Sequence, residues 1–209
     1  MTTAPLNDSL IGRLRVGAIA NAITGVQGFL TQQINALLMT AAKAASLTYY
    51  VQAATAGGAL LQVNKNPDYP RNVEVNCSSA STATVKITGA DTQGNVITET
   101  LTLNGTSTVA GKKSFSRVIS VLLPTVGGQS INVGIGVVFG LNFRTLYNTI
   151  LLAFVDSAAD TNTGTFVAGS TSAGTDYYGT WSPATAPNGT HNYEMYWIPT
   201  DLQNYGVNN

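Results

Sequence analysis

Few residues of this chain could act as acids, bases or nucleophiles. His191 is the only histidine, Cys77 is the only cysteine, and glutamate occurs only at positions 74, 99 and 194. A Ser-His-Asp or Cys-His arrangement would need His191, which follows the turn Pro187-Asn188-Gly189, where a solvated side chain is expected. Cys77 ends a run of strand character, where a small buried thiol is common. We therefore expect no enzymatic activity, and a single cysteine permits no intrachain disulfide.

One segment partly matches a phosphate-binding loop. Gly105 and Gly111 precede Lys112 and Lys113, but five residues separate the glycines and Lys113 stands where the magnesium-binding Ser or Thr belongs. A strand, and not the required helix, is predicted to follow. The lysine pair is better interpreted as a solvated charge or one that protects a strand edge, so no nucleotide site is predicted.

Oxygen-bearing side chains alternate in a second segment, at Asp156, Asp160 and Asn162. Calcium takes oxygen ligands of this kind. However, Thr171 stands where an EF-hand glutamate would be, and no carboxylate lies two residues after Asp160. A turn stabilised by Asp and Asn side chains is the better interpretation, and the sequence predicts no metal and no cofactor.

Aromatic residues are concentrated near the end of the chain, at Tyr177, Tyr178, Trp181, Tyr193, Tyr196, Trp197 and Tyr205. Aromatic side chains fill cores, but they also stack on sugars and dominate protein interfaces. Tyr193 and Trp197 fall in phase on one face of a predicted strand, which favours core packing for that face. A carbohydrate-binding module that uses Trp181, Trp197 and their tyrosine neighbours remains an alternative.

The composition excludes several kinds of partner. Ten Lys and Arg balance ten Asp and Glu, and only 10% of the residues are charged, against about 25% in an average soluble domain. Neutral polar residues replace them, with 28 Thr, 18 Asn and 14 Ser. The sequence has no basic cluster that could bind nucleic acid. It also has no apolar run long enough to span a membrane. A hydrophobic content of 44% predicts a folded core. Residues 1–144 hold all ten basic groups and five acids, and residues 145–209 hold the other five acids.

Residues 1–46 are predicted to form an N-terminal arm. Apolar residues recur every three or four positions from Val16 to Ala45, which predicts one face of a helix. Three glycines, at 17, 25 and 28, weaken its first half, so that part is either helical or an extended arm. Polar residues interrupt the apolar run too often for an export signal. We predict that the arm binds partners through Ile19, Ile23, Phe29, Leu30, Ile34 and Leu37.

Residues 47–209 predict a mainly β domain. Short runs rich in Val, Ile and Thr alternate with Gly, Asn and Pro clusters, as in an antiparallel β-sandwich, possibly a jelly-roll-like one. A turn at Asp91–Asn95 predicts a hairpin, and Asn104-Gly105 and Pro187-Asn188-Gly189 predict further turns. The predicted strands are Val73–Cys77, Ala83–Thr88, Val96–Leu103, Ser114–Leu122, Ile131–Val138, Thr149–Val155, Thr163–Val167 and Tyr193–Ile198.

Three stretches resemble a group of structural proteins from the virions of tailed bacteriophages. They begin at Pro70-Arg71-Asn72-Val73, at Val85-Lys86-Ile87-Thr88-Gly89 and at Thr108-Val109-Ala110-Gly111, and the segment Gly179–Gly189 before a Tyr-rich strand is similar to their endings. The resemblance covers about residues 70–200. It implies a small β-rich subunit, often a head decoration or cement protein, and carries over no catalytic residue.

The resemblance implies a non-enzymatic protein that stabilises the outer surface of a capsid, and the lack of a catalytic set agrees with a structural role. Its expected partners are the major capsid protein and copies of itself, as a dimer or trimer. It would be made in the host cytoplasm and reside on the capsid surface of the virion. A tail, neck or fibre component of the same particle and the carbohydrate-binding module are the alternatives.

Overall fold

The computed structural model describes residues 35–54 and 58–200, which contain fourteen strands and no helix. All strand pairs are antiparallel, so the predicted mainly β, antiparallel fold is confirmed. The strands are β1 (Asn35–Met39), β2 (Ser46–Ala54), β3 (Leu60–Lys65), β4 (Arg71–Cys77), β5 (Thr84–Ala90), β6 (Val96–Thr102), β7 (Val109–Phe115), β8 (Arg117–Leu122), β9 (Ile131–Gly140), β10 (Ile150–Val155), β11 (Ala158–Ala159), β12 (Thr165–Ala168), β13 (Gly179–Ser182) and β14 (Tyr193–Trp197).

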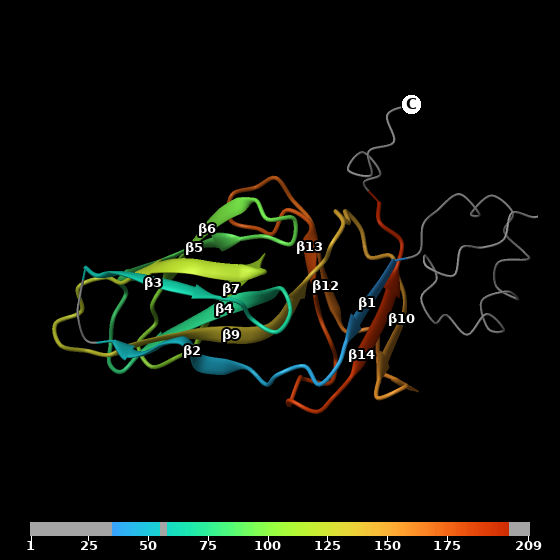
Figure 1. The fold of residues 1–209 in the computed structure, drawn as a ribbon, viewed down its shortest axis with the longest axis horizontal. Coiled ribbons are helices and arrows are strands. Elements are labelled where there is room, and N and C mark those ends of the chain that lie inside the picture. Colours follow the sequence, from blue (N-terminus) through green and yellow to red (C-terminus); the bar gives the residue numbers. More distant parts are fainter. Residues whose placement is uncertain (1–34, 55–57, 201–209) are drawn as a thin grey trace, which may run out of the picture.

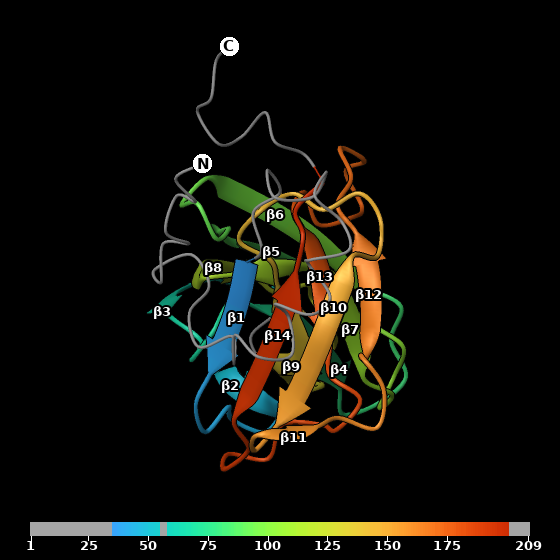
Figure 2. The same ribbon diagram turned by 90° about the vertical axis from the view of Figure 1, so that its right-hand side faces the viewer.

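The strands form three sheets. The central sheet has the order β12-β13-β9-β4-β7, and β2 also pairs with β9. The flanking sheet, β3-β8-β5-β6, lies against one part of it to form a sandwich. The end sheet, β1-β14-β10-β11, stands at one end of the molecule, and its strands run steeply across the direction of β4, β7 and β9 (Figure 1). Figure 2 shows this end sheet face on, with β14 between β1 and β10.

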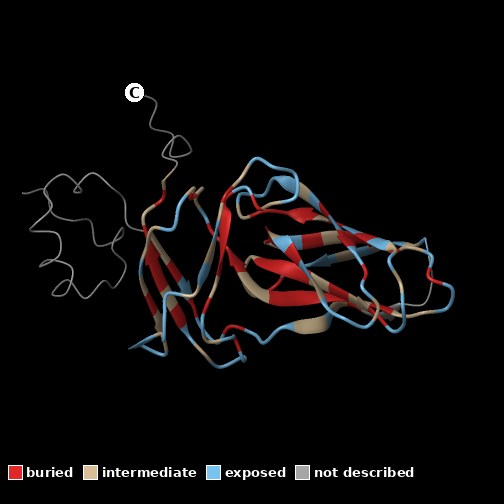
Figure 3. Cartoon of the chain, turned by 180° about the vertical axis from the view of Figure 1, so that it is seen from behind, coloured by how far each residue is buried: buried red, intermediate tan, exposed pale blue. Residues whose placement is uncertain are grey.

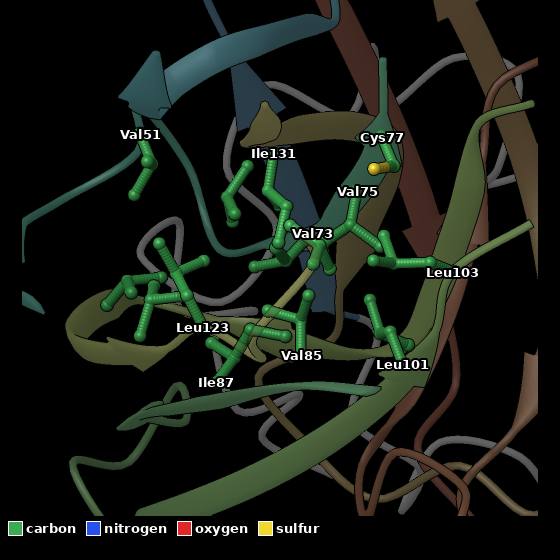
Figure 4. Packing of buried hydrophobic residues seen from close by; sticks show 14 of the residues in the cluster. Val51, Val73, Val75, Cys77, Val85, Ile87, Leu101, Leu103, Leu123 and Ile131 are labelled. Atoms are coloured by element: carbon green, nitrogen blue, oxygen red, sulfur yellow. The ribbon is translucent and has the colours of Figure 1, made fainter. Parts of the chain in front are cut away.

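The main core lies between the central and flanking sheets. Val73 and Val75 of β4 meet Val85 and Ile87 of β5, and Leu101 of β6 closes one side (Figure 4). Each strand contributes alternate residues, as the two-residue period of a strand requires. Buried residues accordingly line the inner faces of both layers (Figure 3).

A second core joins the end sheet to the central sheet. Leu37, Met39, Met195 and Trp197 of the end sheet pack with Phe139 and Trp181 of the central sheet, among others. Both indole N–H groups are satisfied: that of Trp181 donates to the Thr163 carbonyl at 2.7 Å, and that of Trp197 donates to the Thr145 hydroxyl at 3.1 Å. Buried tryptophans need such partners because an unpaired N–H is costly in an interior.

The predicted helix is wrong where the structure can be compared with it. Residues 35–39 form strand β1, and residues 40–45 form a bend and loop; the remainder of the predicted helix, 16–34, lies outside the described residues. Leu37 and Met39 face the second core while Leu38 between them faces outward. Pairing with β14 provides hydrogen-bond partners along one edge of β1, and its side chains follow the two-residue period of a strand.

The predicted strands are found, with one split. The predicted run Ser114–Leu122 is interrupted at Ser116, whose N–H donates to the Ala90 carbonyl at 2.8 Å, so β7 ends there and β8 begins in the flanking sheet. Strands β1, β2, β3, β11 and β13 are not among the predicted ones, and the predicted run includes only the last two residues of β7. The predicted hairpin joins β5 and β6 in uninterrupted register, and Gly94 has the positive φ of 86° that its turn needs.

Strand β2 crosses β9 at a point where only glycine fits. A Cβ atom on Gly134 would overlap the backbone of Ser46 and Leu47. We predict that Gly134→Ala destabilises the protein by about 1–3 kcal/mol, because the backbone must move apart. Gly174→Ala is the matched control: no atom lies within 4 Å of its Cβ, so its effect stays within about 0.5 kcal/mol. Urea denaturation followed by tryptophan fluorescence measures both, and equal stability of the two variants would contradict the packing argument.

Candidate functional site

The structure bears on one of the six residues predicted to bind partners. Ile19, Ile23, Phe29, Leu30 and Ile34 lie outside the described residues. Leu37 belongs to β1 and is buried in the second core. The strand thus turns the Leu37 side chain inward and its neighbour Leu38 outward, and a partner-binding role for the six residues stays a prediction.

The outward side of the end sheet carries mostly apolar residues. Because paired residues of an antiparallel sheet point to the same side, the register defines this outer face, which consists of Ala36, Leu38, Leu152, Phe154, Glu194 and Tyr196. Glu194 is its only charged residue. The Phe154 and Tyr196 rings contact edge to face, with centroids 6.4 Å apart, and the Tyr196 hydroxyl donates to the Glu194 carboxylate at 3.2 Å.

The flanking sheet shows what an ordinary solvent face looks like in this protein. Its outward residues on β5 and β6 are mostly threonine (Thr84, Thr88, Thr98, Thr100 and Thr102) with Lys86, and Val96, Leu122 and Leu60 are exposed beside them. Antiparallel sheets commonly have one polar face toward water and one apolar face toward the core. The end sheet departs from this pattern because it is apolar on both faces. We therefore take its outer face as the candidate interaction surface.

A sequence signal for this surface existed. The residues of β10, Ile-Leu-Leu-Ala-Phe-Val, form an unbroken apolar run. Such a run is typical of a strand that is covered on both faces. The predicted strand Thr149–Val155 contains this run, whose lack of alternation distinguishes it from the other predicted strands.

Buried carboxylates fasten the edge of β7, the end strand of the central sheet. A Glu99 carboxylate oxygen from β6 accepts the Lys112 N–H at 2.6 Å, and an Asp176 carboxylate oxygen accepts the Ser114 N–H at 2.7 Å. Burial raises the pKa of Glu99 and also that of Asp176, although backbone N–H groups oppose the shift in both. These bonds hold the flanking sheet and the 169–178 loop against an edge that would otherwise be open.

A small pocket of about 50 Å³ lies beside these carboxylates. It is lined by Asp91, Ile97, Lys113, Thr175, Asp176, Tyr177 and Tyr178. Its acids already have backbone partners: Asp91 accepts the N–H groups of Gln93 and Asn95 at 2.8 and 2.9 Å. Lys113 donates to the Thr98 carbonyl at 2.9 Å. The polar groups around the pocket thus serve the fold.

His191 pairs with an acid, as a catalytic histidine would. Its Nδ1 lies 2.6 Å from an Asp156 carboxylate oxygen, and the other oxygen accepts the Asn192 N–H at 2.8 Å. The Asn192 N–H and then His191 lower the pKa of Asp156. Asp156 and Ser157 have positive φ values of 51° and 67° and form the tight turn between β10 and β11. The pair therefore ties this turn to the start of β14.

Asp160 and Cys77, the other residues considered for metal binding or catalysis, lie in structural positions. Asp160 accepts the Thr185 hydroxyl at 2.8 Å and the Thr185 N–H at 3.2 Å, so it joins two segments that are 25 positions apart. Cys77 is buried. Within residues 35–54 and 58–200, no three His, Cys, Asp or Glu side chains form a group that could hold a metal ion. In the same ranges, no helix has the length and apolar character needed to cross a membrane.

The two tryptophans do not form a binding platform. Trp181 and Trp197 are 0% and 1% exposed, so neither indole can stack on a sugar at the surface. Both indoles belong to the second core, and a carbohydrate-binding module that uses their tyrosine neighbours stays a prediction. Tyr205 lies outside the described residues.

Comparison of the chain with known protein families, with curated proteins and with solved structures finds no match.

Glu99 gives the fold a testable dependence on pH. The pKa of Glu99 is higher in the folded than in the unfolded chain, so protonation of Glu99 stabilises the fold. This contribution to the free energy of unfolding is complete below the pKa of the unfolded chain. It is lost as the pH rises through the pKa of the folded chain. Glu99→Gln keeps an acceptor for the Lys112 N–H but cannot ionise. We expect the free energy of unfolding to fall less in this variant than in the wild type between about pH 4 and about pH 7.

Asp156→Asn is the control of opposite sign. The pKa of Asp156 is lowered by folding, so its contribution is present above the unfolded pKa and is lost as the pH falls. Its removal should leave the Glu99-dependent slope in place. Urea denaturation at several pH values measures all three proteins, and an unchanged slope in Glu99→Gln would contradict the assignment.

Proposed function

We propose that this chain is a non-enzymatic structural protein of a tailed-phage virion, which binds the outer surface of the capsid as a cement or decoration subunit. It associates with the major capsid protein and with copies of itself. The observation that carries the proposal is the apolar outer face of the end sheet, at the point where the N-terminal segment joins β1. A broad apolar surface suits a protein whose function depends on the area it buries against neighbours.

The polar chemistry of the described chain also supports a structural role. The His191–Asp156 pair fastens a turn, and Glu99 and Asp176 fasten a strand edge. The outward threonines of the flanking sheet give a polar surface with little charge. A subunit of this kind would act by bridging adjacent capsomers and adding buried area at the seams between them. Because many copies bind to one lattice, weak individual contacts add up to a strong total attachment.

The structure fixes where the N-terminal segment should be cut to test this proposal. The predicted arm, residues 1–46, includes β1, whose Leu37 and Met39 pack in the second core. Deleting all 46 residues would therefore damage the β domain. A deletion of residues 1–34 leaves every described strand intact.

We expect the full-length protein to cosediment with expanded phage heads in a fixed ratio, and not with unexpanded heads. The variant without residues 1–34 should lose this binding, because the arm is expected to supply the main lattice contacts. Analytical ultracentrifugation measures binding and self-association in one preparation. Leu60→Lys changes an exposed leucine of β3 and is the control that should bind normally.

Two results would overturn the proposal. Full binding by the variant without residues 1–34 would show that the arm is dispensable. A discrete oligomer that binds no heads would instead favour a tail, neck or fibre component. The copy number in purified virions separates these locations, because a decoration protein is present in many copies and a tail-tip component in few.

A further inference from the structure

The chain contains the same reactive tripeptide twice. Asn104-Gly105-Thr106 lies in the turn between β6 and β7, and Asn188-Gly189-Thr190 lies in the loop before β14. An asparagine followed by glycine is the dipeptide most prone to spontaneous deamidation, because glycine has no side chain to hinder attack by its own nitrogen. Both asparagines are exposed, so exposure alone does not distinguish the two sites.

Deamidation is an intramolecular substitution that needs only water as a co-reactant. The glycine nitrogen gives its proton to hydroxide and attacks Cγ of the preceding asparagine. The bond between Cγ and the side-chain nitrogen breaks, and ammonia leaves. Water then opens the succinimide ring, at Cγ to give aspartate or at the backbone carbonyl to give isoaspartate. The reaction therefore requires a side chain that can rotate toward the glycine nitrogen and a glycine N–H that a base can reach.

Hydrogen bonds hold both reacting groups at Asn188. Its Oδ1 accepts the Thr190 N–H at 2.9 Å, the Thr190 hydroxyl at 2.9 Å and the His191 N–H at 3.0 Å. The Gly189 N–H donates to the Ala42 carbonyl at 2.8 Å. Rotation of the side chain would break three bonds, and release of the nitrogen would break a fourth. This site must therefore open locally before it can react.

Asn104 lacks such restraints on its side chain. The side chain makes no hydrogen bond within residues 35–54 and 58–200. Only its backbone is held, since the Asn104 carbonyl accepts the Ser107 N–H at 3.1 Å. The Gly105 N–H donates to the Ser81 carbonyl at 3.2 Å, a longer bond than that of Gly189. The side chain can thus approach the Gly105 nitrogen by rotation alone, and one weak bond covers that nitrogen.

We propose that Asn104 is a site of spontaneous deamidation in the folded protein, whereas the fold protects Asn188. The product carries an additional negative charge on a chain in which ten basic residues balance ten acidic ones. Isoaspartate also inserts a methylene group into the backbone before Gly105, whose carbonyl accepts the Cys77 N–H at 2.9 Å. This form therefore loosens the contact between the turn and the end of β4. The reaction concerns the isolated chain and is independent of capsid binding.

Peptide mapping by tandem mass spectrometry tests the proposal on the full-length protein during incubation at mildly alkaline pH. In urea, where neither turn persists, the two tripeptides should react at similar rates, because the residues after each asparagine are identical. In the folded protein, Asn104 should react within severalfold of its rate in urea. Asn188 should react at least about tenfold more slowly than Asn104, because only its locally opened form can react.

Asn104→Gln and Asn188→Gln form a matched pair of variants, because glutamine cyclises far more slowly than asparagine. Anion-exchange chromatography separates the deamidated chain by its additional charge. This acidic species should accumulate in the wild type and in Asn188→Gln, and it should be nearly absent in Asn104→Gln. Thr190→Val removes one of the donors to Asn188 and is a second variant in case Asn188→Gln disturbs the loop. It should accelerate the reaction at Asn188 and leave that at Asn104 unchanged.

Either of two findings would refute the proposal. Equal rates at the two sites of the folded protein, or a faster reaction at Asn188, would show that the hydrogen bonds of Asn188 do not protect it. If both sites reacted slowly in the folded protein and readily in urea, the turn between β6 and β7 would protect Asn104 as well.

Discussion

Strand β9 is the element that both cores share, and its glycines are the constraint on which the arrangement depends. Ile131 and Val133 of β9 fill the main core, and Phe139, near its end, fills the second core. On the opposite side of the strand, Gly134 admits the backbone of β2, and Gly136 and Gly140 leave room for side chains from β4 and β7. Larger residues at these positions would force the neighbouring chain segments away, because a closely packed interior has no space to accept them.

Arg71 connects the two cores at this strand. It is fully buried, its guanidinium lies 4.6 Å from the Phe139 ring centroid, and it donates to the Lys43 carbonyl at 2.6 Å. Its Nε lies 3.2 Å from an Asp68 carboxylate oxygen, an ion-pair distance without hydrogen-bond alignment. A buried cation requires such partners, since removing one leaves an uncompensated charge. Arg71 thereby joins the loop after β1, the start of β4 and the end of β9, and it holds the end sheet in place.

The fold class and most central strands could be predicted from alternation and turn chemistry, as the β5–β6 hairpin shows. The helix expected at 35–45 was wrong because Leu37, Leu38 and Ala41 fit a helical period as well as a strand, and only pairing with β14 decides between them. Leu37 was assigned to a partner surface for the same reason. The outer face could not be assembled from sequence, since β1, β10 and β14 are adjacent only in space. The contact between His191 and Asp156 could not be predicted from the sequence either, because 35 positions separate the two residues.

The ionisable residues of this protein mostly stabilise the fold, whereas a group of apolar residues lies on its surface. Groups that could perform chemistry are engaged in holding the fold: Glu99 and Asp176 bind backbone N–H groups of β7, and Asp156 binds His191 beside a tight turn. The outer face of the end sheet, in contrast, contributes nothing to either core. Apolar residues on a sheet face that packs on no other described strand cost free energy in water.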